Sequence, residues 1–114
     1  MQVKFLKSKI HRATLTKTDI DYEGSIGIDW TLAEAAGLQE NEAVHVWNLN
    51  NGERLETYVI KASAGSGEIF LNGAAARLGQ AGDLVIIAAF CWLDAKEKIQ
   101  PKVVLVDERN QIKK

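Results

Sequence analysis

The sequence contains a single cysteine, Cys91, and a single proline, Pro101. One cysteine excludes an internal disulfide and a cysteine-rich zinc site, and it suits the reducing cytoplasm. No Gly/Ser-rich or low-complexity stretch marks a linker between domains. The 114 residues are therefore expected to form one domain with a modest core.

The sequence also lacks a charge excess and a long apolar run. Fourteen Lys and Arg residues balance fifteen Asp and Glu residues, so no overall field favours nucleic acid or an anionic membrane. The longest apolar stretch, residues 84–93, is too short to span a bilayer, and no early segment resembles a signal peptide. His11 and His45 have no second ligand at metal spacing. We expect a cytoplasmic protein without a metal, a membrane contact or a nucleic-acid partner.

Most of the chain reads as short strands separated by turn residues. The clearest pattern is a hairpin with strands at 44–49 and 54–62, which flank Asn51-Gly52, a dipeptide suited to a turn that needs positive φ. The other expected strands are 3–18 (one strand or two), 26–29, 68–71, 83–90 and 102–107.

The helical signals are brief. Thr31 is expected to cap a first helix, with Glu34 as its capping-box partner and Gly37 as its end. Residues 74–79 and 94–98 are expected to form single helical turns. Many short strands with short helices predict a mainly β fold, a compact barrel rather than a doubly wound sheet. Side chains fill so small a barrel, so a ligand site would lie at its rim or between subunits.

One short stretch, Tyr-Glu-Gly-Ser at residues 22–25, interrupts an extended segment. The simplest interpretation is a turn, because glycine tolerates positive φ and marks bends in strands. The other is chemical. The Ser25 hydroxyl can attack the carbonyl carbon of Gly24, which has no side chain to block the approach, and the amide then becomes an ester.

Elimination from that ester would leave a dehydroalanine at position 25. Hydrolysis would convert it into an N-terminal pyruvoyl group with loss of ammonia. The chain would then consist of two pieces, residues 1–24 and 25–114. Gly-Ser pairs are common and almost all are turns, so the pair alone does not establish this chemistry.

Six segments in order and spacing resemble the pyruvoyl-dependent aspartate 1-decarboxylases. They cover nearly the whole chain: KIHRA (9–13), YEGSI.ID (22–29), AAGL.ENEAV.VWN (35–48), NGER..TY.I (51–60), NGAAAR (72–77) and GDLVIIAAF (82–90). The resemblance implies a double-psi β-barrel spanning residues 1–114, a homotetramer and a precursor (zymogen) that cleaves itself into a β chain, 1–24, and an α chain, 25–114. It also implies conversion of L-aspartate to β-alanine and carbon dioxide for pantothenate and coenzyme A synthesis.

The resemblance implies a cofactor and site residues too. Ser25 would become the covalent pyruvoyl group, which forms a Schiff base with the substrate and replaces pyridoxal phosphate and metals. Tyr58 would donate a proton, and Thr57 would serve both processing and substrate binding. The other implied site residues are Gly24 for processing, the backbone of Gly73, Ala74 and Ala75, and the pocket residues Lys9, Tyr22, Trp47, Arg54 and Asn72. A maturation factor is a possible partner.

The chain departs from the family pattern in two places. Arg77-Leu78 replaces a His-Cys pair that some members have, and the segment after Phe90 is the least characteristic part.

The carboxylates of aspartate constrain the roles of the cations. A cation on the α-carboxylate would stabilise the ground state and slow decarboxylation, so we expect Arg54, with Lys9, to hold the β-carboxylate. Arg54 and Thr57 are three residues apart and should face opposite sides of a strand, as should Thr57 and Tyr58. A bulge near Glu56 or a subunit interface at this strand would bring both faces into one site.

Other functions fit the same composition. A non-catalytic β-barrel module, such as a dimeric DNA-binding or interaction domain, would stay in one piece. An unprocessed relative would keep the barrel and lack activity. A related decarboxylase could act on glutamate, although the resemblance favours aspartate.

Overall fold

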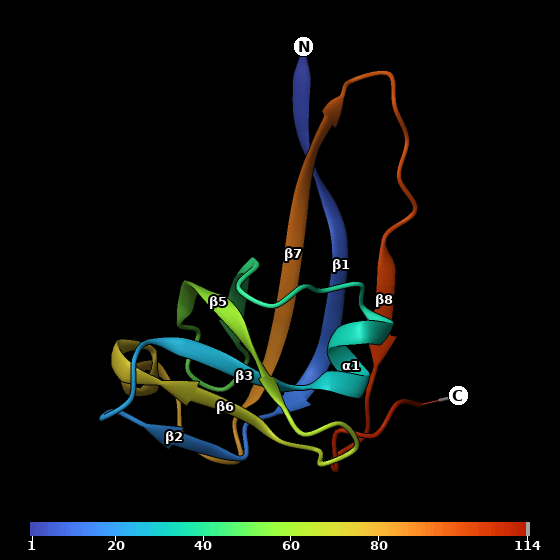
Figure 1. Ribbon diagram of the computed structural model, residues 1–114. Helices are drawn as coiled ribbons and strands as arrows, with labels where there is room; N and C mark the ends of the chain where they lie inside the picture. Colours follow the sequence, from blue (N-terminus) through green and yellow to red (C-terminus); the bar gives the residue numbers. More distant parts are fainter. Residues whose placement is uncertain (114) are drawn as a thin grey trace.

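The structure, a computed structural model, describes residues 1–113. These residues form eight strands, one short α-helix and one 3₁₀ helix (Figure 1). In chain order the elements are β1 (Gln2–Thr14), β2 (Lys17–Asp19), β3 (Ser25–Asp29), α1 (Trp30–Ala35), β4 (Ala43–Asn48), β5 (Arg54–Ala62), β6 (Ile69–Asn72), η1 (Gly73–Leu78), β7 (Leu84–Asp94) and β8 (Lys102–Leu105). None of the helices in residues 1–113 is long and apolar enough to cross a membrane.

The sheet closes on itself. Its strand order is β2-β6-β3-β5-β4-β7-β1-β8, and β1 and β2 are consecutive parts of one extended segment. Between them, the Leu15 N–H donates to the Asp83 carbonyl (2.8 Å) and the Thr16 N–H donates to the Ile69 carbonyl (2.7 Å). The segment therefore bridges β7 and β6 and completes a barrel, with β8 added outside β1 as a parallel strand.

The connections make this a double-psi β-barrel. β3 lies between β5 and β6, which follow one another in the chain, and pairs parallel with the first and antiparallel with the second. In the same way β1 and β2 together lie between β7 and β6, which are also consecutive. Each arrangement is a ψ motif, and the barrel contains two. The predicted mainly β fold is confirmed.

The barrel interior is filled by aliphatic side chains. Alternate residues of the strands point inward, as in β4, where Val44 and Val46 are at most 1% exposed. The largest fully buried side chains are Ile10, Leu15, Ile26, Ile28, Leu32, Ile69, Leu71 and Ile87. A ligand must therefore bind at the rim or on the outer surface, as the small size of the barrel predicted.

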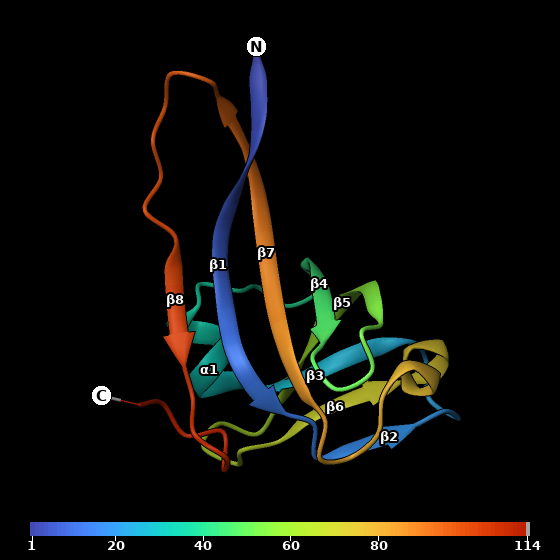
Figure 2. The same ribbon diagram turned by 180° about the vertical axis from the view of Figure 1, so that it is seen from behind.

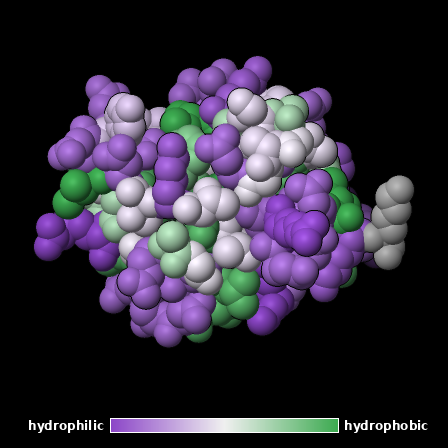
Figure 3. Space-filling view, turned by 90° about the horizontal axis from the view of Figure 1, so that it is seen from below, coloured by the Kyte–Doolittle hydropathy of each residue, from purple (hydrophilic) through white to green (hydrophobic). Residues whose placement is uncertain are grey.

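A two-stranded arm projects from the barrel. β1 and β7 stay paired from Thr14↔Leu84 to Gln2↔Asp94 and extend well beyond the other strands (Figures 1 and 2). The register shifts between Ile10 and Ala13, where Arg12 adopts a φ of +63°. Figure 3 shows the opposite end of the molecule, which is mainly hydrophilic with small, separate apolar patches.

Two helix predictions were wrong. Asp29, not Thr31, caps α1, and its Oδ1 accepts a hydrogen bond from the Thr31 N–H at 2.9 Å. The capping-box pattern misled the prediction because this carboxylate belongs to the last, buried residue of β3. The end of the helix at Gly37 is confirmed by its φ of +71°.

Residues 94–98 do not form a helical turn. β7 continues through Asp94, four residues beyond the predicted end, and a turn follows in which the Asp94 carboxylate accepts from the Lys96 N–H (3.0 Å). Pairing with β1 outweighs the weak local signal here. Residues 3–18 form two strands, and the 3₁₀ helix η1 replaces the predicted turn at 74–79. The other strand ends lie within two residues of the prediction.

Candidate active site

Ser25 lies at the first position of β3, where its hydroxyl is buried and held from two sides. It pairs with Asn72 of β6, and the Asn72 Nδ2 donates to the Ser25 Oγ at 3.1 Å. The Ser25 hydroxyl in turn donates to the Glu23 carbonyl at 3.3 Å. Ser25 is 2% exposed and Asn72 is 5% exposed, so these bonds form away from bulk water. The arrangement fixes the direction in which the serine oxygen can act.

Gly24 precedes this serine at the exposed rim of the barrel, where η1 begins. Gly73 has a φ of +63°, and a Cβ there would lie 2.5 Å from the Gly24 N and 2.7 Å from the Tyr22 carbonyl oxygen. Only glycine allows the two backbones to approach so closely. The interruption predicted at 22–25 is thus a bend that ends at Ser25, with Gly73 packed against it.

Two hollows flank the Gly24–Ser25 bond and share Tyr58. The first, about 420 Å³, is lined by Gly24, Leu55, Glu56, Thr57, Tyr58, Ala74, Ala75 and Leu78. The second, about 370 Å³, is lined by Tyr22, Glu23, Ser25, Tyr58, Ile60 and Asn72. Together with Gly73, eight of the residues predicted from the sequence gather here: Tyr22, Gly24, Ser25, Thr57, Tyr58, Asn72, Ala74 and Ala75.

Strand β5 contributes to both hollows without a bulge. Its pairing with β4 is regular from Ala43↔Tyr58 to Trp47↔Arg54, so the bulge considered near Glu56 is absent. Arg54 and Tyr58 therefore share the outward face, while Thr57 faces the other way. Because the Gly24–Ser25 bond lies at the rim between the hollows, Thr57 and Tyr58 both line space beside it.

Three predicted residues line neither hollow: Lys9, Trp47 and Arg54. The Arg54 guanidinium carbon lies 4.4 Å from the centroid of the Trp47 ring, on the outer surface of β4 and β5. Lys9 lies on β1, opposite Ala88 of β7. The fold of one chain does not bring these three side chains to Ser25.

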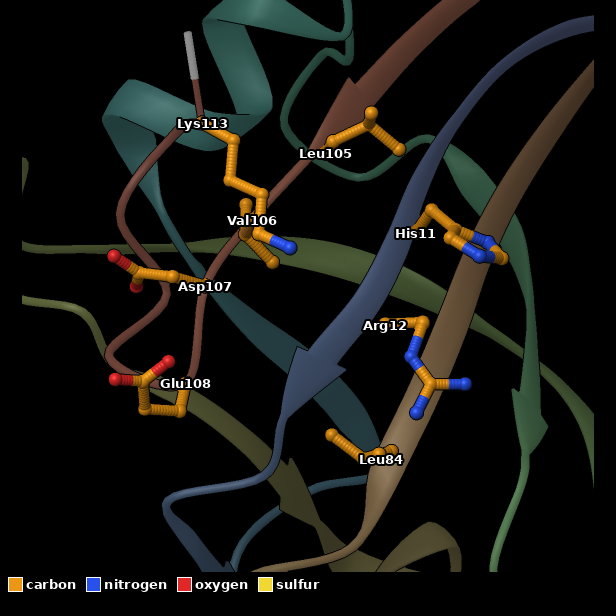
Figure 4. Close-up of a pocket in the computed structure, with 8 residues that line it drawn as sticks. All are labelled: His11, Arg12, Leu84, Leu105, Val106, Asp107, Glu108 and Lys113. Atoms are coloured by element: carbon orange, nitrogen blue, oxygen red, sulfur yellow. The ribbon is translucent and has the colours of Figure 1, made fainter.

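A further hollow lies elsewhere and contains none of the predicted site residues. It measures about 250 Å³, between the bulge at His11 and Arg12 and the segment that carries Asp107, Glu108 and Lys113 (Figure 4). Burial, together with the charges of Lys9 and Arg12, lowers the pKa of His11. The backbone N–H groups of Gln111 and Arg109 lower the pKa of Asp107.

The comparisons with known proteins agree on one family. The family model for aspartate decarboxylase matches residues 1–113. The chain belongs to the aspartate decarboxylase family. The aspartate 1-decarboxylase of Caldicellulosiruptor saccharolyticus is 60% identical over 116 aligned residues, which cover 100% of this chain and 91% of that protein. Those of Leptothrix cholodnii and Burkholderia vietnamiensis are 61% and 58% identical, over 95% and 99% of this chain and 84% and 91% of their own lengths.

A solved structure is also similar to the chain. The crystal structure of the computationally designed msDPBB_sym2 protein superposes with a TM-score of 0.45 at 18% identity, covering 76% of this chain and 96% of that one. The resemblance of the sequence to aspartate 1-decarboxylases is thus confirmed by the family match and by the relatives of high identity.

The structure of this aspartate decarboxylase family member adds residues that the sequence did not single out. Glu23 and Ile60 line the hollow beside Ser25, and Leu55, Glu56 and Leu78 line the other. Ile60 could have been found, because it lies two residues from Tyr58 on the same face of one strand. Glu23 stands within the YEGS motif. Within residues 1–113, no group of three or more His, Cys, Asp or Glu side chains is placed to hold a metal ion.

Proposed function

We propose that this protein is a self-processing decarboxylase that converts L-aspartate to β-alanine and carbon dioxide, a step toward pantothenate and coenzyme A. Relatives named aspartate 1-decarboxylase, up to 61% identical, support the substrate and the reaction. The observation that carries the self-processing is the buried Ser25 hydroxyl, held by Asn72 and Glu23 next to the exposed Gly24 between two hollows.

Processing begins with the serine oxygen. The Ser25 Oγ adds to the Gly24 carbonyl carbon, and the bond from that carbon to the Ser25 nitrogen breaks, which leaves an ester and a free amine. Elimination releases the Gly24 carboxylate and forms dehydroalanine at position 25. One water then enters and one ammonia leaves, which gives a ketone. Asn72 aids the attack because its amide fixes the oxygen, and Gly73 packs against the bend that carries Gly24.

The residues around position 25 fit such a group. The serine is the first residue of a paired strand, so the new end stays anchored by its pairing with Asn72 after cleavage. The piece 1–24 stays bound through the long pairing of β1 with β7 and of β2 with β6. When present, the pyruvoyl ketone supplies an electron sink for the electrons that departing carbon dioxide leaves behind.

In this proposal Tyr58 delivers the proton that replaces carbon dioxide. It lines both hollows that meet at the Gly24–Ser25 bond, on a strand whose regular pairing fixes its direction. A phenol hydroxyl that is held against the reacting carbon can deliver its proton as a general acid. Thr57 lines the first hollow together with Gly24, and in this proposal it takes part in processing.

A second copy of the chain completes the site in this proposal. Lys9, Trp47 and Arg54 lie on the outer surface of the barrel, away from the Ser25 hollows of their own chain. In the homotetramer implied by the resemblance, this surface meets the Ser25 hollows of a neighbour, and Arg54 with Lys9 holds the β-carboxylate of aspartate. Arg54→Lys should then raise the KM for aspartate sharply, because lysine lacks the bidentate fork. Unchanged kinetics would reject that assignment.

The intact mass of the denatured protein tests the proposed function. Two species, residues 1–24 and residues 25–114 less one ammonia, are expected, together with β-alanine formation from L-aspartate. A single full-length mass, before and after addition of a candidate maturation factor, would favour the non-catalytic barrel module instead. Two masses without β-alanine would point to another substrate, and L-glutamate is the next to test.

A further inference from the structure

The hollow beside Ser25 continues along the barrel toward Lys17. An adjoining hollow of about 250 Å³ is lined by Lys17, Tyr22, Ile60, Phe70 and Asn72. Three of these residues, Tyr22, Ile60 and Asn72, also line the hollow that contains Ser25. The two hollows are therefore neighbouring parts of one surface depression, with Ser25 in one part and Lys17 in the other.

The strand register places both residues on the same face of the sheet. Lys17 pairs with Phe70, and Phe70 pairs with Gly27. Asn72, two residues after Phe70 on β6, pairs with Asp19 of β2 and with Ser25 of β3. Because residues two apart share a face, the Lys17 side chain leaves the sheet on the side of Ser25.

The separation suits a small dicarboxylate. Ser25 and Lys17 are two strands apart across the sheet and two residues apart along the strands. The distance between their backbone positions is therefore about 12 Å. The flexible four-carbon stem of lysine and a four-carbon substrate can span that distance together. Aspartate has that length, with an amine at one end of the molecule and a side-chain carboxylate at the other.

The Phe70 ring contacts the Lys17 side chain in the adjoining hollow. The Lys17 Nζ lies 4.9 Å from the centroid of the Phe70 ring, within the range of a cation–π contact. The ring lies over Gly27, because a Cβ at Gly27 would overlap it. Because Gly27 has no side chain, the Phe70 ring can pack directly on its backbone. The ring in turn restricts the directions that the Lys17 side chain can take.

The two parts of the depression carry opposite charges. Within residues 1–113, the ion pairs do not include Lys17, whose side chain is exposed. Glu23 lines the part with Ser25. Asp19 follows Lys17 by two residues on β2 and lines neither part of the depression, and its Oδ1 accepts from the Asp21 N–H at 3.0 Å. An ammonium is favoured near Glu23 and Ser25, and a carboxylate is favoured near Lys17.

We propose that Lys17 binds the side-chain carboxylate of the substrate from the same chain that carries Ser25. This inference rests on the proposed function, because it assumes that a substrate amine must reach position 25. Holding the distal carboxylate leaves the α-carboxylate free to depart, as decarboxylation requires. A carboxylate has two oxygens with about four acceptor sites, so Lys17 can bind it together with a cation from a second copy.

The test compares Lys17→Gln with a matched control, Lys61→Gln. The Lys61 Nζ also lies 4.9 Å from an aromatic ring, that of Trp30, and Lys61 lines none of the hollows around Ser25. Titration calorimetry on the full-length protein measures the binding of succinate and of succinamate, in which a neutral amide replaces one carboxylate. Steady-state kinetics measures KM and kcat for L-aspartate.

We expect Lys17→Gln to weaken succinate binding and to raise the KM by roughly threefold, the range of a solvent-exposed ion pair, with kcat unchanged. Its preference for succinate over succinamate should fall by a similar factor, and the difference from the wild type should shrink at high salt. Lys17→Arg keeps the charge and should stay near the wild type. Phe70→Leu keeps apolar cover on Gly27 and should weaken binding less than Lys17→Gln.

Equal succinate binding and equal KM in Lys17→Gln and Lys61→Gln would overturn the inference. The calorimetric measurement also tests the Lys17 inference separately from the proposed function. If the wild type makes no β-alanine, the proposed reaction fails, yet a preference for succinate that depends on Lys17 would still support a carboxylate site. The loss of both results would reject both ideas.

Discussion

The chain contains two Gly-Ser pairs, Gly24-Ser25 and Gly65-Ser66, and they lie in contrasting surroundings. Ser25 is 2% exposed, and its hydroxyl is bonded to Asn72 and Glu23. Ser66 is exposed in a turn, and its hydroxyl accepts from the Glu68 N–H two residues on, at 3.2 Å. Gly65 has a φ of +80° with open space around it, whereas Gly24 is in contact with Gly73.

The difference shows what the dipeptide alone cannot supply. The second pair is the ordinary turn that most Gly-Ser pairs form, with a local hydroxyl bond to the backbone. The first pair has the same covalent structure, but a side chain 47 positions away fixes its nucleophile. The proposed self-cleavage should therefore depend on partners from another strand, and variants at the two pairs can separate the contribution of the surroundings from that of the dipeptide.

The largest effect is expected from Ser25→Ala. Alanine has no nucleophile, so the bond after Gly24 should stay intact and β-alanine formation should fall to background. Ser66→Ala is the matched control and should be cleaved and active like the wild type. Intact mass and a β-alanine assay read out both variants. Cleavage in Ser25→Ala would mean that another group breaks the chain.

Gly73→Ala should have the next largest effect. The new Cβ would lie 2.5 Å from the Gly24 N, so the backbone must shift, and a displacement of about 1 Å can slow a reaction roughly a hundredfold. Gly65→Ala is the control, because its φ is also positive and nothing lies within 4 Å of its Cβ. Both variants carry a backbone penalty of about 1–2 kcal/mol, visible in urea unfolding. Only Gly73→Ala should lose cleavage.

Asn72→Ala should slow cleavage without abolishing it. The variant removes the amide that donates to the Ser25 Oγ and leaves the Glu23 carbonyl as the remaining partner. A hydrogen bond of ordinary strength corresponds to roughly a two- to tenfold change in rate. A time course of intact mass after a pulse of translation measures it. A rate equal to that of Ser66→Ala would show that the amide does not orient the serine.

The sequence predicted the parts of the site that depend on short-range patterns. The second strand of the predicted hairpin, 54–62, is matched residue for residue by β5, because turn chemistry at Gly52 and strand alternation are both local. The alternation of Thr57 and Tyr58 was predicted as a conflict for a single site. In the structure both side chains line space beside the Gly24–Ser25 bond, which lies at a rim between two hollows. A bulge near Glu56 was the wrong alternative.

The parts that were missed depend on contacts between distant segments. The carboxylate of Asp29, which caps α1, also accepts from the N–H groups of Gly65 and Gly67. These contacts fix its position, and no local sequence pattern could show them. The positions of Lys9, Trp47 and Arg54 relative to Ser25 depend on how the barrel closes. The resemblance named them as site residues without indicating that one chain keeps them apart from Ser25.

Asp29→Asn should affect stability and leave cleavage unchanged. Asp29 is 1% exposed, and its carboxylate accepts from the backbone of Thr31, Gly65 and Gly67 at 2.8–2.9 Å. An amide offers one acceptor oxygen and directs an NH₂ group at a donor, so we expect the free energy of unfolding to fall by about 2–3 kcal/mol. Glu53→Gln, an exposed position in the hairpin turn, serves as the control for loss of a negative charge.

The cleavage rate of the Asp29→Asn variant decides whether the two Gly-Ser pairs are independent. Ser25 and Asp29 stand at opposite ends of β3, about 13 Å apart, and Asp29 secures the loop with the second pair. Measured well below the unfolding temperature, cleavage should match the wild type, because the partners of Ser25 lie on β6 and in the 22–24 bend. Slower cleavage in a fully folded variant would show that the strand transmits a shift from Asp29 to Ser25, and the second pair would then contribute to the surroundings of the first.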